Sequence, residues 1–97
     1  MATYILLANF TEQGLRNVKD TTKRADAVKE AGKKLGVNMK EIYWTMGPYD
    51  IVVVAEAPDD ASISAYALAT GMAGNIRGQT LRAYSRDEMN AVLTRIA

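Results

Sequence analysis

The chain has 97 residues, of which 48% are apolar and 24% charged, and its 12 basic and 11 acidic side chains give a net charge of +1. This composition is typical of a globular protein, and the balanced charge predicts neither nucleic acid nor a membrane surface as a partner. The sequence contains no cysteine and no histidine, which excludes disulfides, thiolate sites and histidine-ligated haem. It shows no signal peptide and no apolar run of ~20 residues, so we expect one cytoplasmic domain over residues 1–97.

The first third of the chain predicts a strand and then a helix. Residues 3–10 form a continuous apolar run that is short for a helix and compatible with a strand. A stripe of apolar or small residues at three- and four-residue steps follows, typical of one helix face. The stripe consists of Leu15, Val18, Thr22, Ala25, Val28, Ala31 and Leu35. Asp20 predicts a cap within this pattern, hence a short turn before the main helix, and Gly36 predicts the end of that helix.

Two further strands are predicted on either side of the turn Gly47-Pro48-Tyr49-Asp50. Residues 38–46 alternate between two faces, whereas residues 50–56 are apolar on both. Gly47 permits a positive φ, Pro48 fixes φ near −65°, and the Asp50 carboxylate can bond to N–H groups of the turn. These properties favour a structural corner. The alternative is that Tyr49 and Asp50 form an acid/base pair at the mouth of a cavity.

The C-terminal half predicts a helix, a strand and a last helix. Asp59 or Asp60 can cap a helix that ends at Gly74 and packs through Ile63, Tyr66, Ala67 and Leu68. A fourth strand is expected within residues 75–85. Ser85 and Glu88 have the spacing of a capping box, and the apolar positions of the helix after it are Met89, Val92, Leu93 and Ile96.

The predicted order β-α-β-β-α-β-α is that of an α+β, ferredoxin-like fold with a four-stranded antiparallel sheet and a C-terminal helix. In this fold the strands at residues 3–10 and 50–56 are central, and both are apolar on two faces. Helices cover only one face of such a sheet, so the second face needs another cover. We therefore expect a homodimer, or a higher homo-oligomer, formed through the sheet.

Three stretches of the chain, taken together, resemble the GYD domain family. They are TYILLANFTEQGLRNVKD, EIYWTMGPYDIVVVAEAPDD and GNIRGQTLRAYS, and the resemblance extends over most of residues 2–88. It implies a fold of the dimeric α/β-barrel type, and the family has no established general function. A similar Gly-x-Tyr/Phe-Asp turn in the effector-binding domains of leucine-responsive regulators favours a structural role for this corner.

The candidate ligand-binding residues are Asn9, Trp44, Tyr49, Asp50 and Arg82. Related dimeric barrels include cofactor-independent monooxygenases and haem-degrading enzymes, which place Asn, Trp and Arg or His around a cavity. By that likeness Asn9, Trp44, Arg77 and Arg82 would face a cavity here. The structural alternatives are that Asn9 caps the following turn and that Trp44 is a core or interface aromatic.

Two hypotheses follow for the function. The leading one is a non-enzymatic homodimer that binds a small molecule or another protein, without a cofactor. The alternative is a cofactor-independent oxygenase or isomerase acting on a small aromatic substrate. In that case Trp44 and Tyr43 would flank the ring, and Asn9 or Arg82 would hold the oxyanion. A structural subunit of a larger oligomer is a third reading, and no residue is assigned a catalytic role.

Other site types are disfavoured by residue order and spacing. Two of the carboxylates of Glu56, Asp59 and Asp60 are better used at a helix start than in a metal site. The glycine-rich residues 71–78 run from a helix into a strand, the reverse of a phosphate-binding loop. The central strand at residues 50–56 is aliphatic, whereas the RNA recognition motif requires aromatic residues there.

Overall fold

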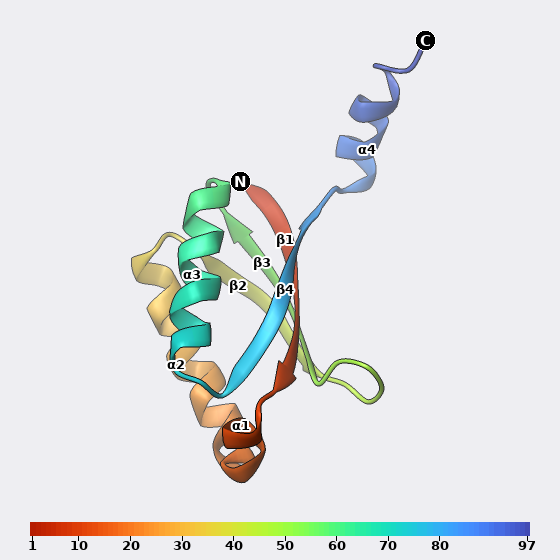
Figure 1. Ribbon diagram of the computed structural model, residues 1–97. Helices are drawn as coiled ribbons and strands as arrows, with labels where there is room; N and C mark the ends of the chain where they lie inside the picture. Colours follow the sequence, from red (N-terminus) through yellow and green to blue (C-terminus); the bar gives the residue numbers. More distant parts are fainter.

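The computed structural model describes all residues from 1 to 97 and consists of one sheet and four α-helices (Figure 1). The elements in chain order are β1 (Ala2–Phe10), α1 (Glu12–Arg16), a 3-10 turn η1 (Val18–Asp20), α2 (Thr21–Lys34), β2 (Asn38–Trp44), β3 (Ile51–Ala57), α3 (Asp60–Met72), β4 (Ile76–Ala83) and α4 (Arg86–Leu93). This order confirms the predicted α+β class.

The four strands form one antiparallel sheet in the order β2-β3-β1-β4, which is the ferredoxin-like arrangement. The two strands that are apolar on both faces, β1 and β3, are central, as predicted. The register pairs Leu7 with Val52 and Ile5 with Leu81, so these four side chains project from the same face. The register of β2 against β3 shifts between Met39 and Glu41, leaving Lys40 as an extra residue.

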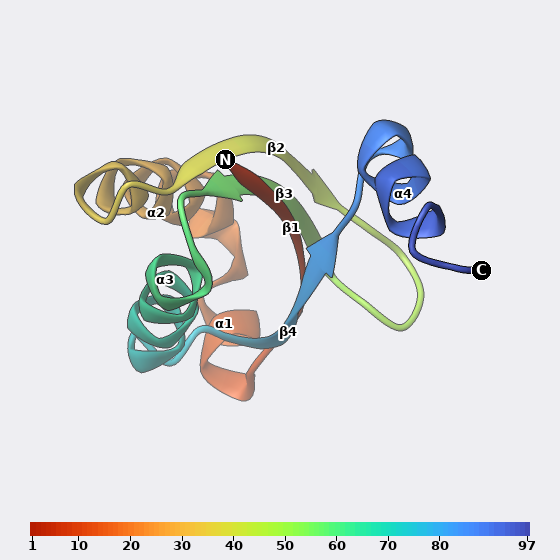
Figure 2. The ribbon, with the colours of Figure 1, turned by 90° about the horizontal axis from the view of Figure 1, so that it is seen from above.

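Helices α2 and α3 both pack against one face of the sheet, and no helix packs against the other face (Figure 2). The core lies between these two layers. It consists of Tyr4, Ala8, Val37, Met39, Ile51, Val53, Ala55, Ala57, Ile63 and Tyr66. Alternate residues of β1 and β3 therefore point into the core, and the residues between them point away from it.

The apolar stripe predicted for α2 is confirmed at Ala25 and Val28 and wrong at its other positions on this helix. The structure buries Gly32 and half-buries Thr21, Ala25 and Val28, whereas Thr22, Ala31 and Leu35 are exposed. The physical reason lies at Gly32, where an added Cβ would be 2.9 Å from Cε1 of Tyr66. The helix approaches the core through its glycine, a contact that a hydrophobicity pattern does not register.

The predicted N-caps are confirmed in α3 and α4 but not in α2, whose C-terminal end before Gly36 is as predicted. The Asp59 carboxylate accepts from the Ser62 N–H at 2.8 Å, and Ser85 forms the complete capping box with Glu88. Asp20 precedes α2 but its side chain accepts no capping hydrogen bond; Thr11 instead caps the short helix α1. In α3, Ile63 and Tyr66 are buried as expected, whereas Leu68 is exposed.

Helix α4 leaves the end of β4 and projects from the body of the molecule, on the side of the sheet opposite α2 and α3 (Figures 1 and 2). None of its residues is buried, and Met89, Val92 and Leu93 expose large apolar side chains. Ile96, predicted to belong to this helix, lies beyond its end and is also exposed. This helix is thus amphipathic without packing into the core of its own chain. None of the helices has the length and apolarity needed to traverse a lipid bilayer.

Candidate functional site

The sheet face away from α2 and α3, here called the open face, has an apolar centre. Its strands contribute side chains that alternate with the core residues, in the registered rows of β1, β3 and β4. The central positions are Ile5, Leu7, Val52, Val54 and Leu81. Charged residues lie toward the edges: Lys40 pairs with Glu56 at 3.7 Å on one side, and Arg77 lies on β4. The surface is an apolar patch with a polar rim, which is the composition of a protein interface.

The hairpin between β2 and β3 is held to β1 by the carboxylate of Asp50. Its Oδ2 accepts from the Phe10 N–H at 2.9 Å and from Nδ2 of Asn9 at 3.5 Å. Nδ2 of Asn9 also donates to the Pro48 carbonyl at 2.8 Å, and Gly47 has a φ of 103°. The predicted bonds from Asp50 to N–H groups of the turn are absent, because the carboxylate is used across strands instead. Asn9 likewise binds the hairpin and does not cap α1.

Tyr43 and Trp44 lie on opposite faces of the sheet, as neighbouring strand residues must. Trp44 points toward α2, where its Nε1 donates to Oγ1 of Thr21 at 3.1 Å. Tyr43 is on the open face, and its hydroxyl lies 3.4 Å from Glu41. The prediction that these two rings flank one aromatic substrate is therefore wrong.

Arg82 lies at the far end of the sheet from the hairpin. It is opposite Tyr4, five residues of β1 away from Asn9, which corresponds to about 17 Å. Its guanidinium donates to Glu88 at 3.0 Å and to the carbonyls of Thr3 and Ala83, and it lies 4.6 Å from the centre of the Tyr84 ring. These contacts fix the beginning of α4.

The five predicted ligand-binding residues thus occupy three separate places. Asn9, Tyr49 and Asp50 meet at the hairpin, Trp44 is on the helix side, and Arg82 is at the other end of β1. Ligand binding by any of them stays a prediction. The three acidic residues considered for a metal are each engaged elsewhere: Glu56 pairs with Lys40, Asp59 caps α3, and Asp60 accepts from the Tyr4 hydroxyl at 2.5 Å.

A cavity of about 280 Å³ lies between α2, α3 and the sheet. Of its 24 lining residues 15 are hydrophobic, and Trp44 stands among them. Two lining residues that sequence reasoning missed are Arg24 and Tyr66, each of which has an enclosed polar atom without a hydrogen-bond partner. Burial raises the pKa of the Tyr66 hydroxyl to about 12. Arg24 could have been recognised from its position four residues before Val28, because that spacing places it on the side of α2 that faces the sheet.

The fold and the open face define a ferredoxin-like α+β protein with an exposed apolar sheet. The model of the GYD domain matches residues 4–93, and the chain therefore belongs to the GYD domain family. It is 32% identical over 84 residues to a Thermus thermophilus protein named "Glutamine synthetase and cystathionine beta-lyase binding protein", covering 86% of this chain and 88% of that protein.

One solved structure, also of a protein from Thermus thermophilus, shares the fold. That crystal structure matches with a TM-score of 0.55 at 25% identity, over 89% of this chain and 100% of its own. This likeness supports the ferredoxin-like α+β fold. The family match confirms the predicted membership of the GYD domain family.

Proposed function

We propose that this protein is a homodimeric interaction module in which a second copy covers the open face. The main observation behind the proposal is that two exposed apolar surfaces, the open face and one side of α4, lie on the same side of the molecule. The open face is apolar at Leu7, Val52 and Val54, and α4 projects on that same side with Val92 and Leu93 exposed. A second chain placed on the open face would meet the helix of the first and offer its own in return.

The areas involved favour a second copy over a smaller occupant. Four strands spaced ~4.8 Å apart and ~25 Å long give the open face roughly 500 Å². A stable interface buries about 800 Å² on each partner. The exposed side chains of α4 would add the remaining buried area. In a two-fold symmetric dimer, the α4 helix of each chain would contact the open face of the other. A chain of 97 residues also has a small core of its own, so burial of this face would add to its stability.

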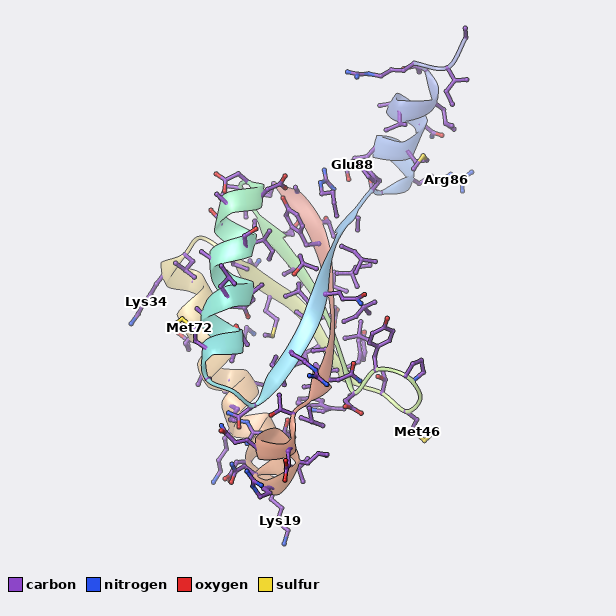
Figure 3. All side chains as sticks on the ribbon, viewed as in Figure 1. Lys19, Lys34, Met46, Met72, Arg86 and Glu88 are labelled. Carbon is purple, nitrogen blue, oxygen red and sulfur yellow. The ribbon has the colours of Figure 1, made fainter.

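The role in protein binding is supported by the relative named as binding glutamine synthetase and cystathionine beta-lyase. A dimer formed through the open face would leave the outer side of α3 free, where Leu68 is 71% exposed and Met72 is 86% exposed. Met72 is labelled in Figure 3. Methionine adapts to differing partner surfaces. We therefore place the contact with a partner enzyme on this side of α3, in a cytoplasmic protein.

The alternative, a cofactor-independent oxygenase or isomerase, has less support. The cavity is large enough for a single ring, but Tyr43 lies on the other side of the sheet and Asn9 is bound to the hairpin. Arg82, the other residue expected to hold an oxyanion, binds Glu88. The residues that the hypothesis requires thus do not converge on the cavity.

The dimer is tested by placing charge on the apolar side of α4. Val92→Lys and Leu93→Lys alter exposed positions, so the fold of the single chain should persist. We expect both variants to dissociate at protein concentrations at which the wild type sediments at twice 10.6 kDa. Ala91→Lys adds the same charge on a different side of the helix and should leave the dimer intact. Equal dissociation constants for all three variants and the wild type would refute the proposed role of α4.

Protein binding is tested with purified glutamine synthetase and cystathionine beta-lyase in biolayer interferometry. The wild-type chain should bind at least one of them, and Leu68→Glu and Met72→Glu should weaken that binding without changing the sedimentation of the chain. Met46→Glu is a matched control, because Met46 is the exposed methionine of the hairpin, away from α3 (Figure 3). Binding that is unaffected by the α3 variants would refute this location, and no binding to either enzyme would refute the partner class.

A further inference from the structure

Two residues that line the cavity between the helices and the sheet each have a polar side-chain atom that the chain leaves without a partner. They are Nη2 of Arg24 and the hydroxyl of Tyr66, both enclosed and both belonging to residues that line the cavity. Tyr66 is 2% exposed. Buried polar atoms in native proteins are nearly always paired, because each unpaired one retains the cost of its lost hydration. An unpaired guanidinium nitrogen on a residue that lines a cavity favours a bound molecule as its missing hydrogen-bond partner.

Arg24 has the geometry of an anion anchor. Its Nη1 donates to the Asn17 carbonyl at 2.5 Å, which fixes the guanidinium and leaves Nη2 free. No carboxylate of the chain neutralises it: the ion pairs are Arg16–Glu12, Lys33–Glu30, Lys40–Glu56 and Arg82–Glu88. A planar guanidinium binds a carboxylate through two parallel N–H groups. The attraction between the two charges is stronger beside apolar walls than in water.

The remaining walls of the cavity favour an apolar body. Hydrophobic residues make up 15 of the 24 lining positions, among them Leu6, Val28 and Ile42. Two of the polar side chains there are already used: Thr21 accepts from Trp44, and Thr70 donates to the Tyr66 carbonyl. A ligand with one negative charge and an apolar remainder therefore matches the cavity, whereas a highly polar one would leave its own groups unpaired.

The size and opening of the cavity limit the ligand further. The volume of about 280 Å³ is just under the ~300–1,000 Å³ usual for small-molecule sites. Tyr66 packs against Gly32, eight residues along α2 from Arg24, which corresponds to ~12 Å of helix. Gly78 and Thr80 line the cavity and are exposed, so it opens to solvent beside β4. A single ring or a short alkyl chain fits between these ends.

We propose that this cavity binds a small monocarboxylate with an aromatic or short aliphatic body, the carboxylate lying on the guanidinium of Arg24. The inference goes beyond the proposed dimer and does not depend on it, because the cavity and the open face are on opposite sides of the sheet. It assigns a ligand class to Arg24, and it gives α3 a second role, since Ala67 and Gly71 leave the room that the ligand fills.

The test uses matched acids and amides as probes: octanoate with octanamide, and phenylacetate with phenylacetamide. Isothermal titration calorimetry of the wild-type protein at millimolar probe should show one site per chain and roughly 10- to 100-fold tighter binding of the acid, the change expected for a hydrogen bond to a charged group. Arg24→Gln should remove the preference for the acid. Lys29→Gln, which removes an exposed charge from the same helix, should keep it.

A second variant separates the cavity from nonspecific anion binding. Ala67→Leu fills part of the cavity and should weaken the acid and the amide alike, while the melting temperature of the empty protein is kept or raised. The proposal is overturned if no acid binds at millimolar concentration, or if acid and amide bind equally. It is also overturned if Arg24→Gln binds the acids as the wild type does. None of these results bears on sedimentation, so the proposed dimer stands or falls separately.

Discussion

The guanidinium of Arg82 donates to the carboxylate of Glu88 at 3.0 Å, and this contact joins the end of β4 to the first turn of α4. The same carboxylate accepts from the Ser85 N–H at 2.9 Å in the capping box. One side chain therefore both begins the helix and sets its direction. Because α4 has no buried residue, these contacts are what orients the helix in the single chain.

Glu88 makes the order of α4 dependent on pH. The Ser85 N–H and then Arg82 hold the pKa of Glu88 below its ordinary value of 4.5. A carboxylate whose pKa is lowered on folding stabilises the folded form above its unfolded pKa, and this contribution is lost as the pH falls through the folded pKa. The protection factors of the α4 amides, which correct for the intrinsic pH dependence of exchange, should thus fall below pH 4.5 in the wild type, whereas those of Glu88→Gln should be low already at neutral pH. Equal protection of α4 in the two proteins at neutral pH would contradict this assignment.

Substitution by alanine should have opposite effects on stability at Gly14 and at Gly71. An added Cβ at Gly14 would overlap the carbonyl oxygen of Asn75, which is backbone and has little freedom to move. Gly14→Ala should therefore destabilise the protein by about 1–3 kcal/mol. Gly71 is within α3 and has open space around its Cβ position, so Gly71→Ala should stabilise by up to about 1 kcal/mol. Urea unfolding checks both, and a loss of stability at Gly71 would show that its surroundings are tighter than described.

The contacts of Asp50 indicate that its carboxylate attaches the β2–β3 hairpin to β1. Asp50→Ala removes the acceptor of the Phe10 N–H and of the Asn9 amide, and should cost about 1–2 kcal/mol. Asp50→Asn keeps one oxygen for the Phe10 N–H and should cost less. The free energy of unfolding of both variants can be read from chemical denaturation. If the two substitutions were equally mild, the carboxylate would not be what fastens this corner to β1.

Much of the fold follows from local sequence signals. The two-sided apolar runs of β1 and β3 predicted their central positions, and Asp59, Ser85 and Gly36 marked helix ends that the structure contains. Each of these signals depends on neighbours in the chain, so a single sequence contains it in full. The family followed from the same stretches.

The misses depend on contacts between distant residues. The rotation of α2 depends on Gly32 meeting Tyr66, 34 positions away in sequence, and Asp50 binds the Phe10 N–H across 40 positions. Arg24 is one of several basic residues on its helix, and only the packing of α2 against the sheet distinguishes it from the solvated lysines. Arg82 was placed near the other candidate residues by likeness to related dimeric barrels, and its contact with Glu88, six residues further along the chain, was not foreseen; its ligand binding stays a prediction.

Sedimentation equilibrium of Val52→Asp and Leu81→Asp, two substitutions in the open face, is the decisive test of the dimer. We expect the wild type at twice 10.6 kDa and the variants at 10.6 kDa with unchanged circular dichroism. Thr80→Asp, on β4 but on the helix side, should remain dimeric. Val53→Asp should unfold, because Val53 is in the core. A monomeric wild type at micromolar concentration, or open-face variants that remain dimeric, would contradict the claim that the open face joins two copies of this chain.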